Sequence, residues 1–154
     1  GLLAELRADA AAAIVEVRQL VEGLRPPALD ELGLVGALQT WCSGLRAVGG
    51  VPIAVEFEGD GQVAGMTAAA EAAAYRIAVE ALTNVARHSG ARQATVSFTR
   101  TEDEWRMEVR DSGVGGTWTP GVGMTSMRER AEAIGGRLDA GDGLVSLTLP
   151  SFPR

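Results

Sequence analysis

The chain has 154 residues, of which 14 are basic and 20 acidic, so its formal net charge is −6 at pH 7. This length allows one ordinary domain with a short additional segment. The acidic balance argues against a general nucleic-acid binder, and the single cysteine, Cys42, excludes an internal disulfide and a cysteine zinc site. No apolar run reaches the roughly 18–20 residues of a membrane-spanning helix. We therefore expect a cytoplasmic domain, with any membrane anchor in segments upstream of it.

Residues 1–25 predict a single helix, with no glycine before Gly23. Its apolar residues recur at alternating steps of three and four, a heptad seam made of Leu3, Leu6, Ala10, Ala13, Val17, Leu20 and Leu24. One helix cannot bury such a seam alone, so we expect a stalk helix with partners upstream or in a second chain. Packing back onto its own domain is the alternative. Gly1 lies inside the pattern, which predicts a piece of a longer protein, and Arg25-Pro26-Pro27 ends the helix.

Residues 26–154 predict alternating helices and strands. The predicted helices are an amphipathic one with Leu34, Leu38, Trp41, Leu45 and Val48 on one face that ends at Gly49-Gly50, one from the N-cap Thr67 to about His88, and one from about Thr125 to Ile134. The predicted strands cover 51–57, 94–98, 105–109, a segment at Leu138, and 145–149. This order predicts an α+β fold, a two-layer sandwich of a mixed sheet with helices on one face.

Three short segments carry candidate chemistry. Glu80, Asn84 and His88 follow at i, i+4 and i+8, so on a helix they form one stripe beside the apolar face, with Arg87 at its flank. The amide oxygen of Asn84 is a ligand type that Mg²⁺ accepts, and Glu80 is placed to hold a metal-bound water or accept a proton. Such a stripe alone is also common on solvated helices.

The second segment, residues 111–116, begins with Asp111 at a strand end and continues with closely spaced glycines, including Gly113 and Gly115. An aspartate there can accept a hydrogen bond from an exocyclic amine such as that of adenine. The third segment, residues 121–124, places Gly121 and Gly123 just before a predicted helix, where free amides favour phosphates.

In this order the segments resemble the nucleotide-binding boxes of the GHKL superfamily of ATPases, which share the Bergerat fold. Residues 80–88 (EALTNVARH) resemble the N box of sensor histidine kinases, 111–115 the G1 box and 121–130 the G2 box. Residues 24–34 (LRPPALDELGL) resemble the end of the stalk in nitrate-sensor-type kinases. The resemblance covers essentially the whole chain. It implies that residues 1–25 are the second helix of the dimerisation and phosphotransfer stalk and residues 26–154 the ATP-binding catalytic domain.

The resemblance also implies roles for single residues. Asn84 would ligate Mg²⁺, Glu80 would be the catalytic group near the γ-phosphate of ATP, and Asp111 would bind the adenine amine. The further nucleotide-binding positions that it implies are Arg87, His88, Gly113, Gly115, Gly121, Gly123, Met124 and, beside the adenine, Thr148.

In these kinases the accepting histidine lies on the first stalk helix, whereas the single histidine here, His88, falls in the N box. The expected reaction is therefore phosphoryl transfer from ATP to a histidine on an upstream helix outside this sequence, so the chain alone should not autophosphorylate. The implied partners are a response regulator with a helix-turn-helix output domain and a second copy, bound through the stalk. A non-catalytic kinase-like regulatory or binding module and an anti-sigma-factor-type serine kinase are the alternatives.

Overall fold

The structure is a computed structural model that describes residues 25–112, 122–141 and 143–151. The predictions for the seam of residues 3–24 and for Gly113, Gly115 and Gly121 lie outside these ranges. The helices are α2 (Pro27–Cys42), α3 (Ala68–Asn84) and α4 (Val122–Ala133), with a 3₁₀ turn η1 (Asp60–Val63) and a π turn η2 (Val85–Ser89). The strands are β1 (Ala54–Glu58), β2 (Gln93–Arg100), β3 (Glu104–Asp111), β4 (Arg137–Gly141) and β5 (Leu144–Pro150).

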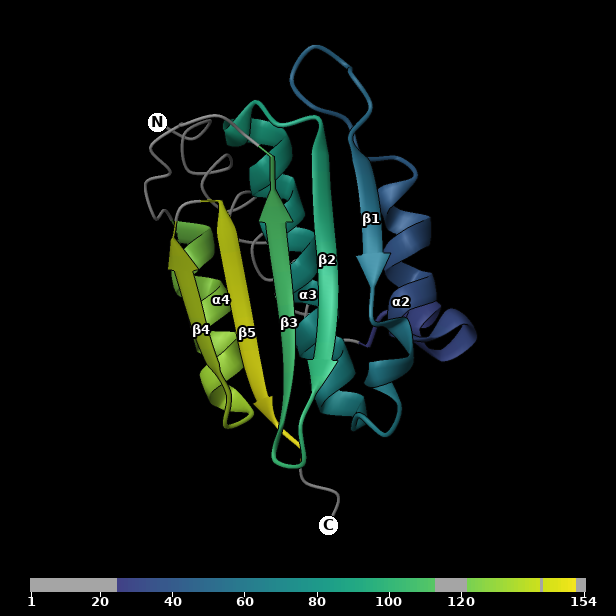
Figure 1. Ribbon diagram of the computed structural model, residues 1–154, viewed down its shortest axis with the longest axis vertical. Helices are drawn as coiled ribbons and strands as arrows, with labels where there is room; N and C mark the ends of the chain where they lie inside the picture. Colours follow the sequence, from purple (N-terminus) through teal and green to yellow (C-terminus); the bar gives the residue numbers. More distant parts are fainter. Residues whose placement is uncertain (1–24, 113–121, 142, 152–154) are drawn as a thin grey trace, which may run out of the picture.

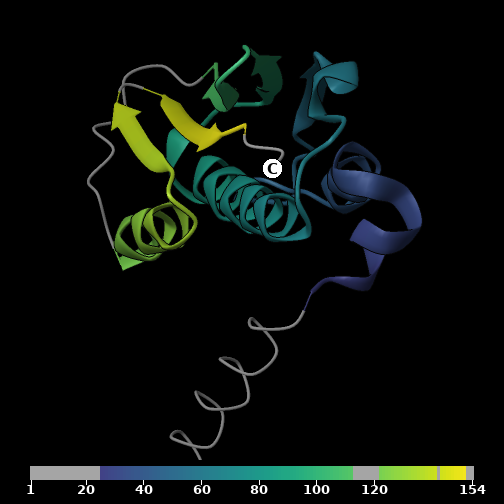
Figure 2. The same cartoon turned by 90° about the horizontal axis from the view of Figure 1, so that it is seen from below.

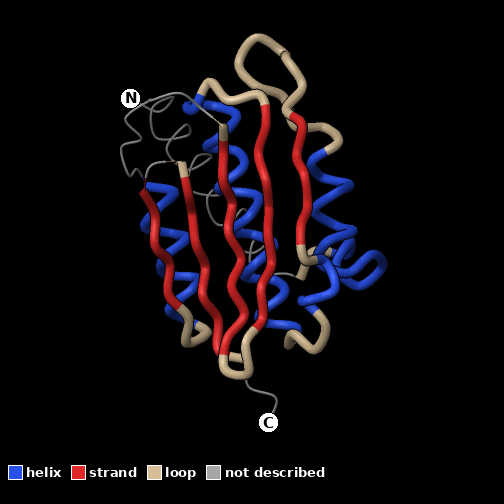
Figure 3. The backbone as a smooth tube through the Cα atoms, in the orientation of Figure 1, coloured by secondary structure: helices blue, strands red, loops and turns tan. Residues whose placement is uncertain are grey.

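The five strands form one mixed sheet in the order β1-β2-β3-β5-β4. β1 pairs with β2 in parallel, and the other neighbours are antiparallel. All three helices lie behind the same face of the sheet (Figure 1), and the view from below shows two layers (Figure 2). The tube drawing separates the red strands from the blue helices in the same way (Figure 3). The predicted two-layer α+β sandwich is confirmed.

The core lies between the two layers, and α3 runs through its middle. Alternate residues of the central strands face the helices, as Val96, Met107 and Leu147 do, and each of them is at most 2% exposed. The buried face of α3 is rich in alanine, which lets the helix pack close to the sheet: Ala70, Ala73, Ala74, Ala78 and Ala81. This packing fixes where the two ends of α3 lie relative to the strands.

Helix α2 differs from its prediction at its C-terminal end. It ends at Cys42, where the Ser43 hydroxyl donates a hydrogen bond to the Thr40 carbonyl, and the chain then turns back through a bridge between Arg46 and Pro52. The prediction that the helix continues to Gly49-Gly50 is wrong, and Val48 is 80% exposed instead of buried. Gly33 also kinks α2, because its φ of 73° is a conformation that favours glycine.

Strand β1 is shorter than the predicted strand 51–57. It begins at Ala54, because the residues before it belong to the turn that the Arg46–Pro52 bridge closes. Val51 is 38% exposed in this turn, while Ile53 is buried. Val55 and Phe57 face the helix layer but are only half-buried, because β1 is an edge strand of the described sheet. The predicted alternation is confirmed, and the predicted start of the strand at residue 51 is wrong.

Helix α3 begins where the sequence predicts, and the α-helix ends at Asn84, four residues before the predicted end near His88. The Thr67 side chain accepts a hydrogen bond from the Ala70 amide at 3.1 Å, the expected N-cap. After Asn84 the helix widens into the π turn η2, which ends at Gly90 with φ 66°. Within the described ranges no helix has both the length and the apolar composition needed to cross a bilayer.

Candidate functional site

Asn84 and Asp111 lie at the same end of the sandwich. Asn84 is the last residue of α3 and Asp111 the last of β3, and both elements end at the top of Figure 1. Only residues 90–92 connect the π turn to β2, whose Ala94 lies opposite Asp111 in the ladder. The short connection and the pairing therefore bring the C-terminal end of α3 close to the end of the strands where Asp111 lies.

Glu80 and Asn84 occupy the half-buried margin of α3. They are four residues apart, so they stack on one side of the helix beside the buried positions Ala81 and Leu82. Within the described ranges no group of three or more His, Cys, Asp or Glu could hold a metal ion. A cation at this end would therefore need oxygens from a substrate as well as from Asn84, which is how Mg²⁺ commonly binds with nucleotides.

Arg87 and His88 lie in the π turn and not in the regular helix. Both are exposed, and the wider turn moves His88 out of the straight i, i+4, i+8 stripe that the sequence predicts. The Ala86 carbonyl accepts a hydrogen bond from the Val48 amide at 3.4 Å, so the turn contacts the loop that follows α2. Glu80 and Asn84 therefore lie on one side of α3 as predicted. Arg87 and His88 do not continue this stripe, because they belong to the π turn.

The half-buried carboxylate of Asp111 is flanked by the small residues Ala94 and Gly143. The Asp111 amide donates to the Gly143 carbonyl at 3.0 Å. A Cβ atom on Gly143, whose φ is 73°, would sit 3.3 Å from Asp111 Oδ1, so the backbone there fits closely around the carboxylate. The Ser112 amide donates to the Gln93 carbonyl at 3.1 Å and fixes the chain just beyond Asp111.

The helix expected from Thr125 begins three residues earlier, at Val122. Gly123 is thus in the first helical turn, not in the loop before it, because the chain from Val122 already has helical geometry. The Met124 side chain is 2% exposed and packs in the core. Any contact between Met124 and a phosphate would have to come from its backbone amide.

Thr148 is not brought to this end of the sheet. It pairs with Arg106, five positions before Asp111 on β3, which is roughly 17 Å along a strand. It also lies on the sheet face away from the helices, because its neighbours Leu147 and Leu149 point into the core. The structure therefore separates Thr148 from Asp111, and Gly143 takes the place beside the carboxylate.

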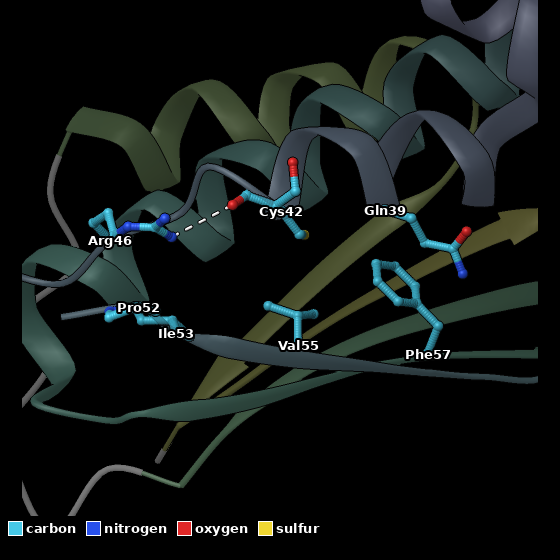
Figure 4. A pocket seen from close by; sticks show the side chains of 8 residues that line it. Gln39, Cys42, Arg46, Pro52, Ile53, Val55 and Phe57 are labelled. Carbon is cyan, nitrogen blue, oxygen red and sulfur yellow. Dashed lines mark hydrogen bonds between the residues drawn. The ribbon is translucent and has the colours of Figure 1, made fainter.

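A separate pocket of about 620 Å³ lies between α2 and β1 (Figure 4). Its lining contains no carboxylate and consists of Gln39, Cys42, Ser43, Arg46, Pro52, Ile53, Val55 and Phe57. It contains none of the predicted site residues. The chemistry that the sequence points to lies at the ends of α3 and β3.

Sequence reasoning missed Ala94 and Gly143. Gly143 lies in the turn directly before β5, and a glycine at such a position can also mark a close approach of the backbone. Its partner could not be read from the sequence, because the antiparallel register that places it beside Asp111 is a long-range property of the sheet.

Comparisons with known proteins point to one group. The chain is 35% identical to the sensor histidine kinase MctS of Rhizobium johnstonii over 92% of this chain and 33% of that protein. It is 33% identical to the sensor histidine kinase LiaS of Bacillus subtilis over 90% of this chain and 40% of LiaS. The nitrate/nitrite sensor protein NarX of Escherichia coli is 28% identical over 88% of this chain and 23% of NarX. The chain thus spans about a quarter to two fifths of these relatives.

Solved structures share the fold. A blue-light activated histidine kinase of Erythrobacter litoralis superposes with a TM-score of 0.57 at 19% identity, over 74% of this chain and 44% of that one. The histidine kinase AdeS of Acinetobacter baumannii superposes with a TM-score of 0.52 at 13% identity, over 97% of this chain and 98% of the other. No protein-family model matches the chain.

Proposed function

We propose that this homologue of the sensor histidine kinases is the ATP-binding catalytic domain of such a kinase. The observation that supports the proposal most is the placement of Asn84 and Asp111 at one end of the sandwich, although 27 residues separate them in the chain. This end of the sandwich would then offer both a carboxylate suited to a purine amine and an amide oxygen suited to Mg²⁺. The similarity to the sensor kinases over most of the chain supports the same assignment.

The residues at this end fit Mg·ATP. Asp111 would accept a hydrogen bond from the adenine amine, with Ala94 and Gly143 leaving space for the ring. Asn84 would offer its amide oxygen to Mg²⁺, which would neutralise part of the charge on the phosphates. Arg87 and His88 would pair with phosphate oxygens, and Glu80 would polarise the group that receives the phosphate. For Gly113, Gly115, Gly121, Gly123 and the Met124 amide we propose phosphate and lid contacts.

The phosphate acceptor in this proposal is a histidine on an upstream stalk helix. Phosphoryl transfer depends mainly on positioning and charge stabilisation, so the domain would supply both once that helix is docked. We further propose that residues 1–25 belong to the stalk, that two copies associate through it, and that the phosphate passes to a response regulator of the helix-turn-helix output class. The reaction consumes ATP, so we place the domain in the cytoplasm.

Isothermal titration of Mg·ATP into the chain tests the proposal. We expect saturable binding that weakens by about 1.5–3 kcal/mol in Asp111→Asn, because the amide cannot replace the charged acceptor. Arg110→Ala is the control, since Arg110 is an exposed neighbour on the other face of β3, and it should bind as the parent does. Absence of heat at millimolar nucleotide would favour a non-catalytic module, and equal affinity in Asp111→Asn would refute the proposed site.

A further inference from the structure

Strand β1 has one edge with which no other described strand pairs. The Ala54 amide donates to the Arg92 carbonyl at 3.0 Å, and in a parallel pair every second residue bonds to the neighbouring strand. The residues at even positions of β1 therefore direct their backbone groups at β2, whereas Val55 and Phe57 direct theirs outward. These outward amides and carbonyls form no hydrogen bond with another described residue. Such an edge is a template for a further strand.

The protein's own chain covers this edge only before Val55. The Ile53 amide donates to the Leu45 carbonyl at 3.2 Å, so the loop after α2 lies against the edge up to that point. The free part of the edge begins at Val55 and ends with β1 at Glu58. A strand added there would be short, and it would exchange its hydrogen bonds with Val55 and Phe57.

Helix α2 extends past this edge of the sheet. Figure 1 draws α2 outside β1, and the view from below places it on the same side (Figure 2). The pocket of about 620 Å³ lies between the two elements, and Val55 and Phe57 point from β1 toward the helix (Figure 4). The helix layer is thus wider than the described sheet here. Side chains of an added strand that face the helices would enter this pocket.

The other face of β1 carries two carboxylates. Glu56 and Glu58 are exposed on the side away from the helices, and neither forms an ion pair with another described residue. The face toward the helices presents Val55 and Phe57, and no carboxylate lines the pocket there. A strand that fits both faces has apolar residues in the pocket and, between them, lysine or arginine beside the two carboxylates.

The same carboxylates disfavour a second copy of this chain at the edge. The antiparallel register that uses both outward residues pairs Val55 of one copy with Phe57 of the other. It places the two Glu56 side chains directly opposite each other on one face, and like charges in that arrangement are destabilising. Charged residues on an edge strand commonly prevent self-association in this way. A basic strand meets no such repulsion.

We propose that the free edge of β1 binds an extended segment of a partner protein by strand addition, a segment in which apolar residues alternate with lysine or arginine. Main-chain hydrogen bonds to Val55 and Phe57 provide affinity, and the pocket and the two carboxylates select the alternating pattern. The edge lies apart from the ends of α3 and β3, so this inference does not depend on the proposed function.

A short synthetic peptide of alternating lysine and valine is the probe, added to the ¹⁵N-labelled chain and followed by NMR. We expect saturable binding that slows hydrogen exchange at the Val55 and Phe57 amides and leaves the Glu56 amide, which already faces β2, nearly unchanged. A peptide with glutamate in place of lysine should not bind. Equal binding of the two peptides, or unchanged exchange at Val55 and Phe57, would overturn the proposal.

Methylation of the peptide's own amides separates strand pairing from charge attraction. In an added strand the amides of alternate residues face β1, and the amides between them face solvent. Methylation of one alternate set should therefore abolish binding, and methylation of the other set should leave it nearly unchanged. Similar affinities of the two methylated peptides would show that no strand is added.

Charge reversal on the protein tests the selection of basic residues. Glu56→Lys should weaken binding of the lysine peptide about threefold to thirtyfold, the size of a cross-strand charge pair that changes from attractive to repulsive, and should strengthen binding of the glutamate peptide. Asp139→Lys changes the net charge equally on β4, the opposite edge strand, and should bind as the parent does. Equal losses in the two variants would overturn the proposal, because net charge alone would explain them.

Hydrogen exchange without peptide tests the other possible occupants. The Val55 and Phe57 amides should exchange fast in the dilute chain and at higher protein concentration. Protection that grows with protein concentration would mean that a second copy fills the edge. Protection already present in the dilute chain would mean that another segment of this chain fills it. Either result would overturn the assignment of the edge to a partner protein.

Discussion

The carboxylate of Asp111 lies against the backbone of Gly143, where a Cβ atom would come within 3.3 Å of Oδ1. Asp111 is the last residue of β3 and Gly143 lies in the turn directly before β5, and the Asp111 amide donates to the Gly143 carbonyl at 3.0 Å. The φ of Gly143, 73°, is a conformation that residues with side chains rarely adopt. A side chain at position 143 would therefore crowd the carboxylate of Asp111.

Replacing Gly143 tests this relationship. Gly143→Ala adds a Cβ beside the carboxylate and strains the backbone, so we expect weaker Mg·ATP binding and a loss of about 1–2 kcal/mol of stability. Gly141→Ala, at the last residue of β4, adds a Cβ that meets no atom within 4 Å, and this variant should bind nucleotide as the parent does. Calorimetry and urea unfolding of both variants give the comparison. Equal affinities in the two variants would show that the space beside Asp111 is not used.

The N-cap of α3 should contribute to the stability of the domain, and this helix carries Glu80 and Asn84. Thr67→Ala removes the acceptor for the Ala70 amide, and we expect a loss of about 1 kcal/mol in the free energy of unfolding. Thr40→Ala, at an exposed position inside α2, should be neutral or stabilising, since alanine is the better helix former. If chemical denaturation gives the same change for both variants, the cap does not stabilise α3.

The thiol of Cys42 should be unreactive in the folded protein. Burial raises its pKa from 9.0 to about 11, so at pH 8 its thiolate fraction is about a hundredfold below that of the unfolded chain. We expect modification by a thiol reagent to be slower by at least that factor in native buffer than in urea. A native rate equal to the rate in urea would contradict the burial of this group.

The same shift predicts a dependence of stability on pH. The folded pKa lies above the unfolded one, so the stabilisation is fully present below pH 9 and is lost as pH rises toward 11. The sequence contains no lysine, so few other groups titrate in this window. Cys42→Ala should show a smaller fall in unfolding free energy between pH 9 and 11. An identical fall in both proteins would contradict the prediction.

Phosphorylation assays test where the acceptor lies. The 154-residue chain should incorporate no label from [γ-³²P]ATP, because its one histidine is His88 in the proposed nucleotide site. A longer protein with the upstream stalk helix should acquire an acid-labile label, as phosphohistidine does. Strong acid-labile labelling of the present chain would contradict the assignment of the acceptor to the upstream helix.

Local patterns in the sequence predicted most of the fold. Alternation placed β2, β3 and β5, and the cap at Thr67 placed the start of α3, because these features depend on neighbouring residues. The end of α2 was not predictable in this way. Leu45 and Val48 continue the helical spacing of the apolar residues in the sequence. In the structure they lie outside α2, because the chain turns after Cys42 and Arg46 forms a bridge with Pro52.

The candidate site was predictable to a similar extent. Asn84 and Asp111 were identified by residue type and spacing, and the topology places them at one end of the sandwich. The place of Gly143 beside Asp111 and the pairing of Thr148 with Arg106 were not predictable, because both are decided by the register between β3 and β5. Register depends on pairing across the sheet, and a single sequence contains no direct signal of it.

The central claim is that Asn84 and Asp111 serve one nucleotide site, and a titration of the ¹⁵N-labelled chain with Mg·ATP followed by NMR tests it most directly. We predict that the amides around Asn84 and those around Asp111 and Gly143 shift together, with one dissociation constant. Shifts confined to the pocket around Gln39 and Arg46, or shifts around only one of Asn84 and Asp111, would contradict the account.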